Sequence, residues 1–320
     1  MTVRIAHISD LHVLEWGGTS PLRFANKRIT GLANLFGARK NAHPTWLLRR
    51  AFAEVQQHDV EHIIISGDLS NLALESEFEA ARSAIKELGD GARVSVVPGN
   101  HDVYTSGAFK KGRFESFFAP WMVPIDADDK SIASASEAGR SHYPYRKILP
   151  SGVHIYGLSS AIPAPPLFAW GKVGQRQLLR LRELIAAEQT TPIARVVIVH
   201  HNMHPRSGFV ETSARMLDRD QVLATLSDTG CDVALHGHTH TPQQHTFRRS
   251  DGHELVILGC GSSTWLKPDH GHFAHFNIME FSDSGLSDVR AFTWDPEGQT
   301  FRLKDASPLQ AARTRGLAAG

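Results

Sequence analysis

Hydrophobic residues along the chain gather in short runs that alternate with longer amphipathic segments. The short runs have the composition of strands that are covered on both faces. They are Val3–Ile8, His62–Ile65, Val94–Val97, Val153–Leu158, Arg195–Val199 and Val233–Leu235. Apolar residues recur at helical spacing in Thr45–His58, Glu75–Leu88, Gln175–Gln189 and Arg219–Ser227. Alternating strands and helices predict an α/β fold, with helices packed against a sheet.

The pattern changes after His240, where consecutive strand-like segments are separated by Gly, Asp and Ser. They are Gln243–Arg248, Glu254–Leu258, His272–Phe281 and Asp288–Trp294. Such a series predicts an antiparallel half-sheet that completes the fold. Residues 13–44 and 103–150 are neither clean strand nor clean helix and begin just after strand ends, which indicates insertions of about 13–53 and 103–150 over one edge of the sheet. We interpret them as cap insertions in a single domain, residues 1–304, followed by a flexible tail, residues 305–320.

Composition narrows the class of protein. With 41% hydrophobic and 21% charged residues, the chain can build a hydrophobic core. Its net charge of +1 gives no overall positive field, so we do not expect specific nucleic-acid binding. The only cysteines, Cys231 and Cys260, exclude a disulfide scaffold and a cysteine-based zinc site. No apolar run is long enough to span a membrane, and the first residues lack the pattern of a signal peptide. We therefore expect a cytoplasmic protein.

Polar clusters follow five of the predicted strands. They are Asp10-Leu11-His12, Gly67-Asp68, Gly99-Asn100-His101-Asp102, His200-His201-Asn202 and His236-Gly237-His238-Thr239-His240. Ligands gather at the carboxyl ends of strands in sheets of this kind. Oxygen and imidazole donors without thiolate suit Mn, Fe, Zn or Co. The five clusters together predict a metal site at one edge of the sheet, in which a carboxylate such as Asp68 can bridge two ions.

This order of motifs, D-x-H, G-D-x-x-N, G-N-H-D, a later strand-end His and G-H-x-H, resembles the calcineurin-like metallophosphoesterase superfamily. The resemblance spans residues 3–281. It implies a four-layer α/β/β/α sandwich of two mixed sheets with a binuclear metal site at the strand ends. One ion would be held by Asp10, His12, Asp68 and His240, and the other by Asp68, Asn100, His200 and His238. His101 would be catalytic, touching the phosphate and assisting the leaving group.

The resemblance also implies a metal-dependent phosphoric ester hydrolase, a phosphodiesterase or phosphatase. A metal-activated hydroxide would attack phosphorus in line with the leaving oxygen. Asn71 stands where the purple acid phosphatase branch has a metal-binding Tyr, which favours two divalent ions, Mn²⁺ or Fe²⁺, with Zn²⁺ or Co²⁺ as alternatives. His200 and His201 compete for one ligand position. The family's ligand directly follows the strand, which favours His200 and leaves His201 and Asn71 as substrate-binding candidates.

Residues 16–53 are rich in cations and apolar side chains and contain no acidic residue. Arg23, Lys27 and Arg28 are therefore further substrate-binding candidates, and the segment can meet an anionic substrate or the inner face of a membrane. The alternative is a cap helix whose cations are solvated.

Residues 21–40 are also similar to a bacterial subgroup proposed to cleave a nucleotide-linked acyl sugar in lipid A synthesis. Three functions stay open. The first is hydrolysis of a phosphate-ester small molecule or nucleotide. The second is pyrophosphohydrolysis of a lipid-linked nucleotide of the UDP-diacylglucosamine type. The third is a non-catalytic scaffold with the same fold.

Overall fold

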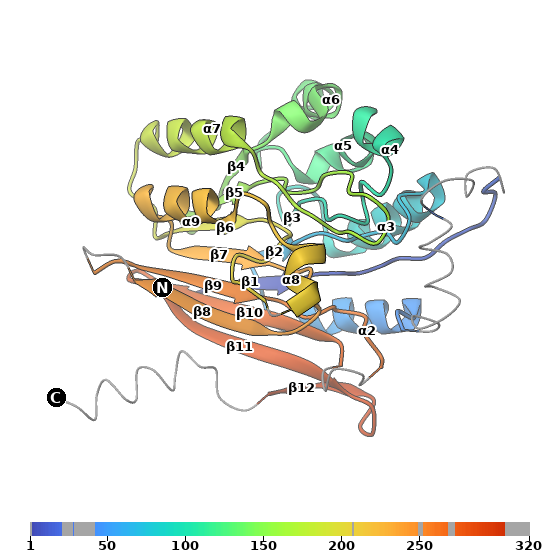
Figure 1. The fold of residues 1–320 in the computed structure, drawn as a ribbon. Coiled ribbons are helices and arrows are strands. Elements are labelled where there is room, and N and C mark those ends of the chain that lie inside the picture. The colour runs from blue at the N-terminus through green and yellow to red at the C-terminus, as the bar shows by residue number, and fades with distance from the viewer. Residues whose placement is uncertain are drawn as a thin grey trace.

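The computed structural model describes residues 2–20, 28, 42–206, 208–248, 252–267 and 273–304. Their strands form two six-stranded sheets (Figure 1). In the first sheet, of order β12-β11-β10-β1-β2-β3, the last three strands are parallel and the others are antiparallel. The strands are β1 (Val3–Ile8), β2 (His62–Ile65), β3 (Val94–Val96), β10 (His275–Ser282), β11 (Gly285–Asp295) and β12 (Thr300–Leu303).

The second sheet has the order β4-β5-β6-β7-β9-β8. Its four inner strands are parallel, and an antiparallel strand closes each edge. The strands are β4 (Tyr145–Ile148), β5 (Val153–Gly157), β6 (Ala194–Ile198), β7 (Val233–His236), β8 (Gln243–Arg248) and β9 (Glu254–Gly259). The strands after His240 therefore do not form one antiparallel half-sheet. The β8–β9 hairpin extends the second sheet, while β10 pairs with β1 in the first.

Helices cover both outer faces of the paired sheets. The apolar faces of α2 (Thr45–Gln56) and α3 (Glu75–Leu88) share one core with the first sheet and with the inward side chains of the second. The helices α7 (Gln175–Ala186) and α9 (Arg219–Asp228) share a smaller core with the other face of the second sheet. Side chains alternate between faces along a strand, so β5 sends Ile155 to the first core and Tyr156 to the second. The predicted four-layer sandwich of two mixed sheets is confirmed.

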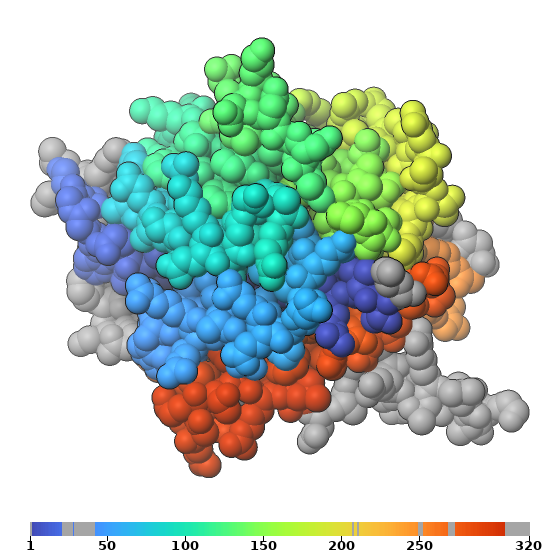
Figure 2. All heavy atoms as spheres, turned by 180° about the vertical axis from the view of Figure 1, so that it is seen from behind, coloured from blue at the N-terminus to red at the C-terminus, as the bar shows by residue number. Residues whose placement is uncertain are grey.

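Residues 103–150 form short helices before β4. These are α4 (Ser106–Lys110), α5 (Arg113–Phe118), η2 (Ala119–Trp121), α6 (Asp129–Ala138) and η3 (Gly139–His142). The rings of Phe114 and Phe118 lie 6.2 and 5.7 Å from Phe78 of α3, so α5 extends the core. Figure 2 shows this segment in green above the blue-to-cyan band of α2 and α3. The end of the predicted insertion differs from expectation, because Tyr145–Ile148 form an edge strand. Among the described helices, none combines the length and apolarity needed to cross a bilayer.

Candidate metal centre

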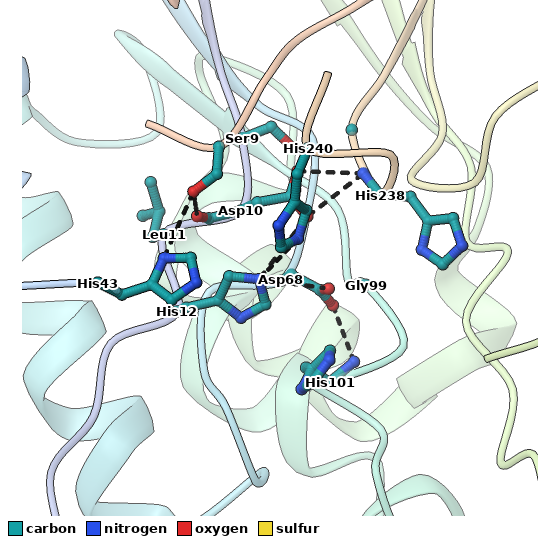
Figure 3. Close-up of polar contacts among 12 residues, drawn as sticks. Ser9, Asp10, Leu11, His12, His43, Asp68, Gly99, His101, His238 and His240 are labelled. Carbon is teal, nitrogen blue, oxygen red and sulfur yellow. Dashed lines mark hydrogen bonds and ion pairs between the residues drawn. The ribbon is translucent and has the colours of Figure 1, made fainter. Parts of the chain in front are cut away.

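The five polar clusters meet where β1, β2, β3, β6 and β7 reach their carboxyl ends, as the close-up in Figure 3 shows for most of them. Backbone hydrogen bonds join the turns that carry them. The N–H of Asp10 donates to the carbonyl of Gly67 and that of His12 to the carbonyl of Asp68, each at 3.0 Å. The N–H of Gly237 donates to the carbonyl of His200 at 3.1 Å, which links the two turns of the second sheet. Residues from distant parts of the chain thus share one rigid frame.

The first predicted ligand set is close enough to hold one ion. His12 Nε2 lies 3.1 Å from His240 Nε2 and 3.9 Å from Asp10 Oδ1. His240 Nε2 lies 3.3 Å from Asp10 Oδ1, and His12 Nε2 lies 4.0 Å from Asp68 Oδ2. Metal–ligand bonds of about 2.1 Å place two ligands of one ion roughly 3–4 Å apart. Asp10, His12, Asp68 and His240 therefore fit a transition-metal ion.

The second predicted set shares the Asp68 carboxylate. His200 Nε2 lies 3.3 Å from Asp68 Oδ2 and has no hydrogen-bond partner among the described residues, while its Nδ1 pairs with the carbonyl of Ser66 at 2.8 Å. His238 Nδ1 lies 2.9 Å from Asn100 Oδ1. A ring whose one nitrogen is tied to a carbonyl and whose other nitrogen faces a carboxylate is arranged as metal-binding histidines usually are. The ring centroids of His200 and His238 are 5.2 Å apart, so the second predicted set lies together beside the first and is compatible with a second ion that shares Asp68.

Burial and neighbouring charges set the protonation states of the candidate ligands. Burial raises the pKa of Asp68, but the neighbouring His200 and His101 outweigh it and hold that pKa well below its usual value. Burial lowers the pKa of His200, but the carboxylate of Asp68 outweighs it and raises that pKa to about 9. Burial and His200 lower the pKa of His238 to about 3. The Asp68 carboxylate is thus ionised and the His238 ring neutral, the forms in which these groups bind metals, whereas the His200 ring is protonated at neutral pH and must release its proton when an ion binds.

The ligand residues occupy an unusual backbone conformation. Five of them have positive φ, namely Asp10 (52°), His12 (47°), Asp68 (52°), His238 (67°) and His240 (55°). Aspartate and histidine are among the non-glycine residues most often found there, so the residue types suit both the turns and the chemistry.

Two glycines leave room for the carboxylates. A Cβ on Gly99 would lie 2.1 Å from Asp68 Oδ1, and one on Gly237 would lie 2.4 Å from Asp10 Oδ2. Any side chain at these positions would displace a ligand, which explains why both turns contain glycine.

His101 lies beside the ligands in a fixed orientation. Its backbone N–H donates to Asp68 Oδ1 at 2.8 Å, and its Nδ1 lies 2.7 Å from the carbonyl oxygen of Asn71. A carbonyl can only accept, so Nδ1 carries the hydrogen. The ring stands edge-on to that of His12, with 4.9 Å between centroids. His101 is therefore held in one tautomer and one orientation at the edge of the centre.

Three of the predicted substrate-binding side chains have other partners. The Asn71 amide donates to the carbonyl of His12 at 2.5 Å. Arg28, 3% exposed, donates to the carbonyls of Leu72 and Ala73 at 2.7 and 2.9 Å. Asn71 and Arg28 therefore stabilise the backbone at and next to the ligand turns. We had predicted instead that they contact the substrate. Arg23 and Lys27 lie outside the described residues.

His201 is the third predicted substrate-binding residue whose side chain has other partners. Its two ring nitrogens lie 2.8 Å from Ser160 Oγ and 3.1 Å from the carbonyl oxygen of Ala169. Both nitrogens are therefore engaged away from the carboxylates. This geometry favours His200 over His201 as the metal ligand.

Sequence reasoning missed one histidine at the centre. The ring of His43 lies 4.4 Å from that of His12 and 5.1 Å from that of Trp265. His43 precedes α2 within a basic segment and belongs to no motif, so only the fold identifies it.

Two candidate ligand sets that share a carboxylate thus lie at the strand ends of a four-layer sandwich, the arrangement expected of a dimetal phosphoesterase. Residues 3–242 match the family model described as calcineurin-like phosphoesterase, and the chain belongs to this family. It is accordingly a phosphoric ester hydrolase, and the family implies a dimetal site.

Solved structures share the fold at low sequence identity. A dimetal phosphatase from Danio rerio is 13% identical with a TM-score of 0.50, and the match covers 91% of this chain and 94% of that one. A purple acid phosphatase from yellow lupin is 12% identical with a TM-score of 0.56, over 95% of this chain and 53% of that one. A 5'-nucleotidase precursor from Thermus thermophilus is 13% identical with a TM-score of 0.50, over 94% and 56%. The chain thus spans about half the length of the last two. No curated protein matches it significantly.

Proposed function

We propose that the chain hydrolyses phosphoric diesters or monoesters of small molecules or nucleotides. Two divalent ions would be held by Asp10, His12, Asp68, Asn100, His200, His238 and His240. The observation that carries the proposal is the Asp68 carboxylate, whose Oδ2 lies within 4.0 Å of a histidine from each ligand set. When bound, such ions polarise the phosphoryl group and lower the pKa of water.

His101 serves the leaving group in this proposal. The carbonyl of Asn71 accepts from Nδ1 and so fixes which edge of the ring faces the centre. In the protonated ring both nitrogens carry a hydrogen, so Nε2 would contact the phosphate and pass its proton to the departing oxygen, which leaves the neutral ring with its hydrogen on Nδ1. General-acid help of this kind contributes about 10²–10⁴-fold.

Asp102 keeps the two neighbouring turns in register. Its carboxylate accepts from the N–H groups of Leu69, Ser70 and Gly99 at 2.9–3.1 Å. It therefore positions the turns of Asp68 and Asn100.

Mn²⁺ or Fe²⁺ is the proposed pair of ions, with Zn²⁺ or Co²⁺ as alternatives. The donor set contains carboxylates, imidazoles and one amide and no thiolate, which suits these metals. Asn71 occupies the position at which purple acid phosphatases have a tyrosine ligand. Its side-chain amide donates a hydrogen bond to the carbonyl of His12.

The alternative substrate, a lipid-linked nucleotide of the UDP-diacylglucosamine type, has support from the surface of α2. Trp46 is 44% exposed and lines a shallow hollow with Arg49 and Arg50. An exposed indole beside two arginines suits contact with anionic lipid headgroups. This surface would place the protein in the cytoplasm at the inner face of the membrane.

An activity panel with Mn²⁺ tests both substrates. It compares bis-p-nitrophenyl phosphate, p-nitrophenyl phosphate, cyclic AMP and a UDP-linked acyl sugar. Turnover of the first three substrates supports the main proposal, and turnover of the last alone supports the alternative. Two bound ions without turnover of any substrate would favour a non-catalytic scaffold.

A further inference from the structure

His43 brings a third imidazole to the first ligand set. It lies directly before Pro44, the residue that precedes α2, and outside all five motif clusters. Nitrogen atoms of His12, His43 and His240 lie within 4.8 Å of one another. The ring centroid of His43 is 4.4 Å from that of His12 and 5.9 Å from that of His240 (Figure 3).

Hydrogen bonds fix the orientation of the His43 ring. Its Nδ1 lies 2.7 Å from the hydroxyl of Thr264, and that hydroxyl donates to the carbonyl of Leu11 at 3.0 Å. A hydroxyl has one hydrogen, so Thr264 accepts from His43 and Nδ1 carries the hydrogen. The lone pair is then on Nε2, the nitrogen that Figure 3 shows turned toward His12.

This arrangement is the one that metal-binding histidines need. Such residues donate one ring N–H to a second group, which sets the tautomer and aims the other nitrogen at the ion. Thr264 performs that task from the loop after β9, and the same hydroxyl contacts the turn that carries Asp10. The ring of Trp265 stands 5.1 Å from His43 and 5.6 Å from His240 and closes the outer side of the pair.

We propose that His43 is a further protein ligand of the first ion, beside Asp10, His12, Asp68 and His240. The inference rests on the proposed metal centre and deepens it. Ligands of one ion stand roughly 3–4 Å apart, so a small movement of His43 completes the set. Imidazole donors favour Fe, Co and Zn, whereas oxygen donors and water favour Mn, so His43 shifts the preference of this position toward the former metals.

The test compares metal binding in wild type, His43→Ala, His43→Gln and the control His253→Ala. His253 is a suitable control because its Nε2 pairs with the carbonyl of Cys231, away from the ligand turns. Metal-free protein is titrated separately with Co²⁺ and Mn²⁺ by calorimetry, and the Co²⁺ absorption spectrum is recorded. We expect two ions in wild type and in the control. Both His43 variants should bind one of the two Co²⁺ ions about 10–100-fold more weakly, with altered absorption bands and a smaller change for Mn²⁺.

Unchanged affinity and unchanged Co²⁺ spectra in His43→Ala would overturn the proposal, and lower activity in that case would mark His43 as a substrate contact. If His43→Ala does not fold, His43→Gln decides, since it retains an amide donor for Thr264. An anomalous map of metal-loaded wild type gives an independent answer. A His43 nitrogen about 2.1 Å from the ion supports the proposal, and one beyond about 3 Å refutes it. Fewer than two ions in wild type would instead refute the proposed function and this inference with it.

Discussion

Adding a single methyl group at Gly99 should disrupt both ligand sets, because the new atom would meet the residue that they share. A Cβ at this position would lie 2.1 Å from Asp68 Oδ1, 2.4 Å from the Asp68 nitrogen and 2.7 Å from Asp68 Cγ. Carbon atoms pack best at about 3.5–4.0 Å, so the carboxylate or the turn must move by roughly 1 Å or more. Metal–ligand distances tolerate only about 0.2 Å.

Gly99→Ala should therefore weaken the binding of both metal ions by about 100-fold or more. This is the upper end of the loss of metal affinity seen when the groups that support metal ligands are disturbed. Overpacking at a buried site should also lower the free energy of unfolding by about 1–3 kcal/mol. The assay dialyses the protein against graded Mn²⁺, counts metal per chain, and measures hydrolysis of bis-p-nitrophenyl phosphate and urea unfolding on the same samples. Activity should follow metal content.

Gly107→Ala is the matched control. Gly107 lies in α4, and outside the backbone of its own helix and its chain neighbours the nearest atom to an added Cβ is the hydroxyl oxygen of Thr105 at 4.0 Å. Alanine is also favoured over glycine in helices. Its metal content and activity should equal those of wild type. Two ions bound by Gly99→Ala with wild-type affinity would refute the reasoning from Asp68, and loss of only one ion would show that Asp68 does not serve both.

Three further predictions follow from neighbouring side chains. His101→Ala should keep both ions and lose about 10²-fold or more in kcat, and loss of metal would show instead that His101 is a ligand. His200→Ala should lose the second ion while His201→Ala keeps both, as measured by metal content, and the opposite result would reverse the assignment. Lys147 of β4 is buried, donates to the carbonyl of Val94 at 2.7 Å, and has its pKa lowered to about 7 by burial. Between pH 7 and pH 10 the unfolded chain keeps a proton that the folded chain has lost, so the free energy of unfolding should rise by about 1 kcal/mol per pH unit. Urea unfolding at pH 7, 8 and 9 should show this slope in wild type and not in Lys147→Met.

Strong local patterns predicted much of the fold. Val3–Ile8, His62–Ile65, Glu75–Leu88 and Gln243–Arg248 have the predicted bounds. The first three have a clear apolar pattern, whereas Gln243–Arg248 is delimited by the turn residues that separate it from the next strand. β4 could not be predicted in this way, since its Tyr-Arg-Lys-Ile sequence lacks an apolar run. The burial of Lys147 depends on a carbonyl of β3, and no local rule reports such a partner.

The candidate metal site could be predicted where the order of residue types along the chain matches the motifs of the family. The structure brings the seven predicted ligands together, although their roles stay predictions. Asn71 and Arg28 show the limit of residue type, because their donors serve backbone carbonyls. His43 shows another limit. It approaches His12 only through the path of the chain before α2, and its sequence context carries no signal.

The left-handed backbone at five of the ligands has a consequence for the order of folding. Each non-glycine residue in this conformation costs on the order of 1–3 kcal/mol and persists only when its surroundings impose it. A short peptide containing Ser9–Val13 should therefore not hold this shape alone. Asp10, His12 and Asp68 depend on the first sheet, whereas His238 and His240 depend on the second. The centre can take its final shape only after the two sheets have docked, so capture of the ions is a late event, and metal added during refolding should leave the early steps unchanged.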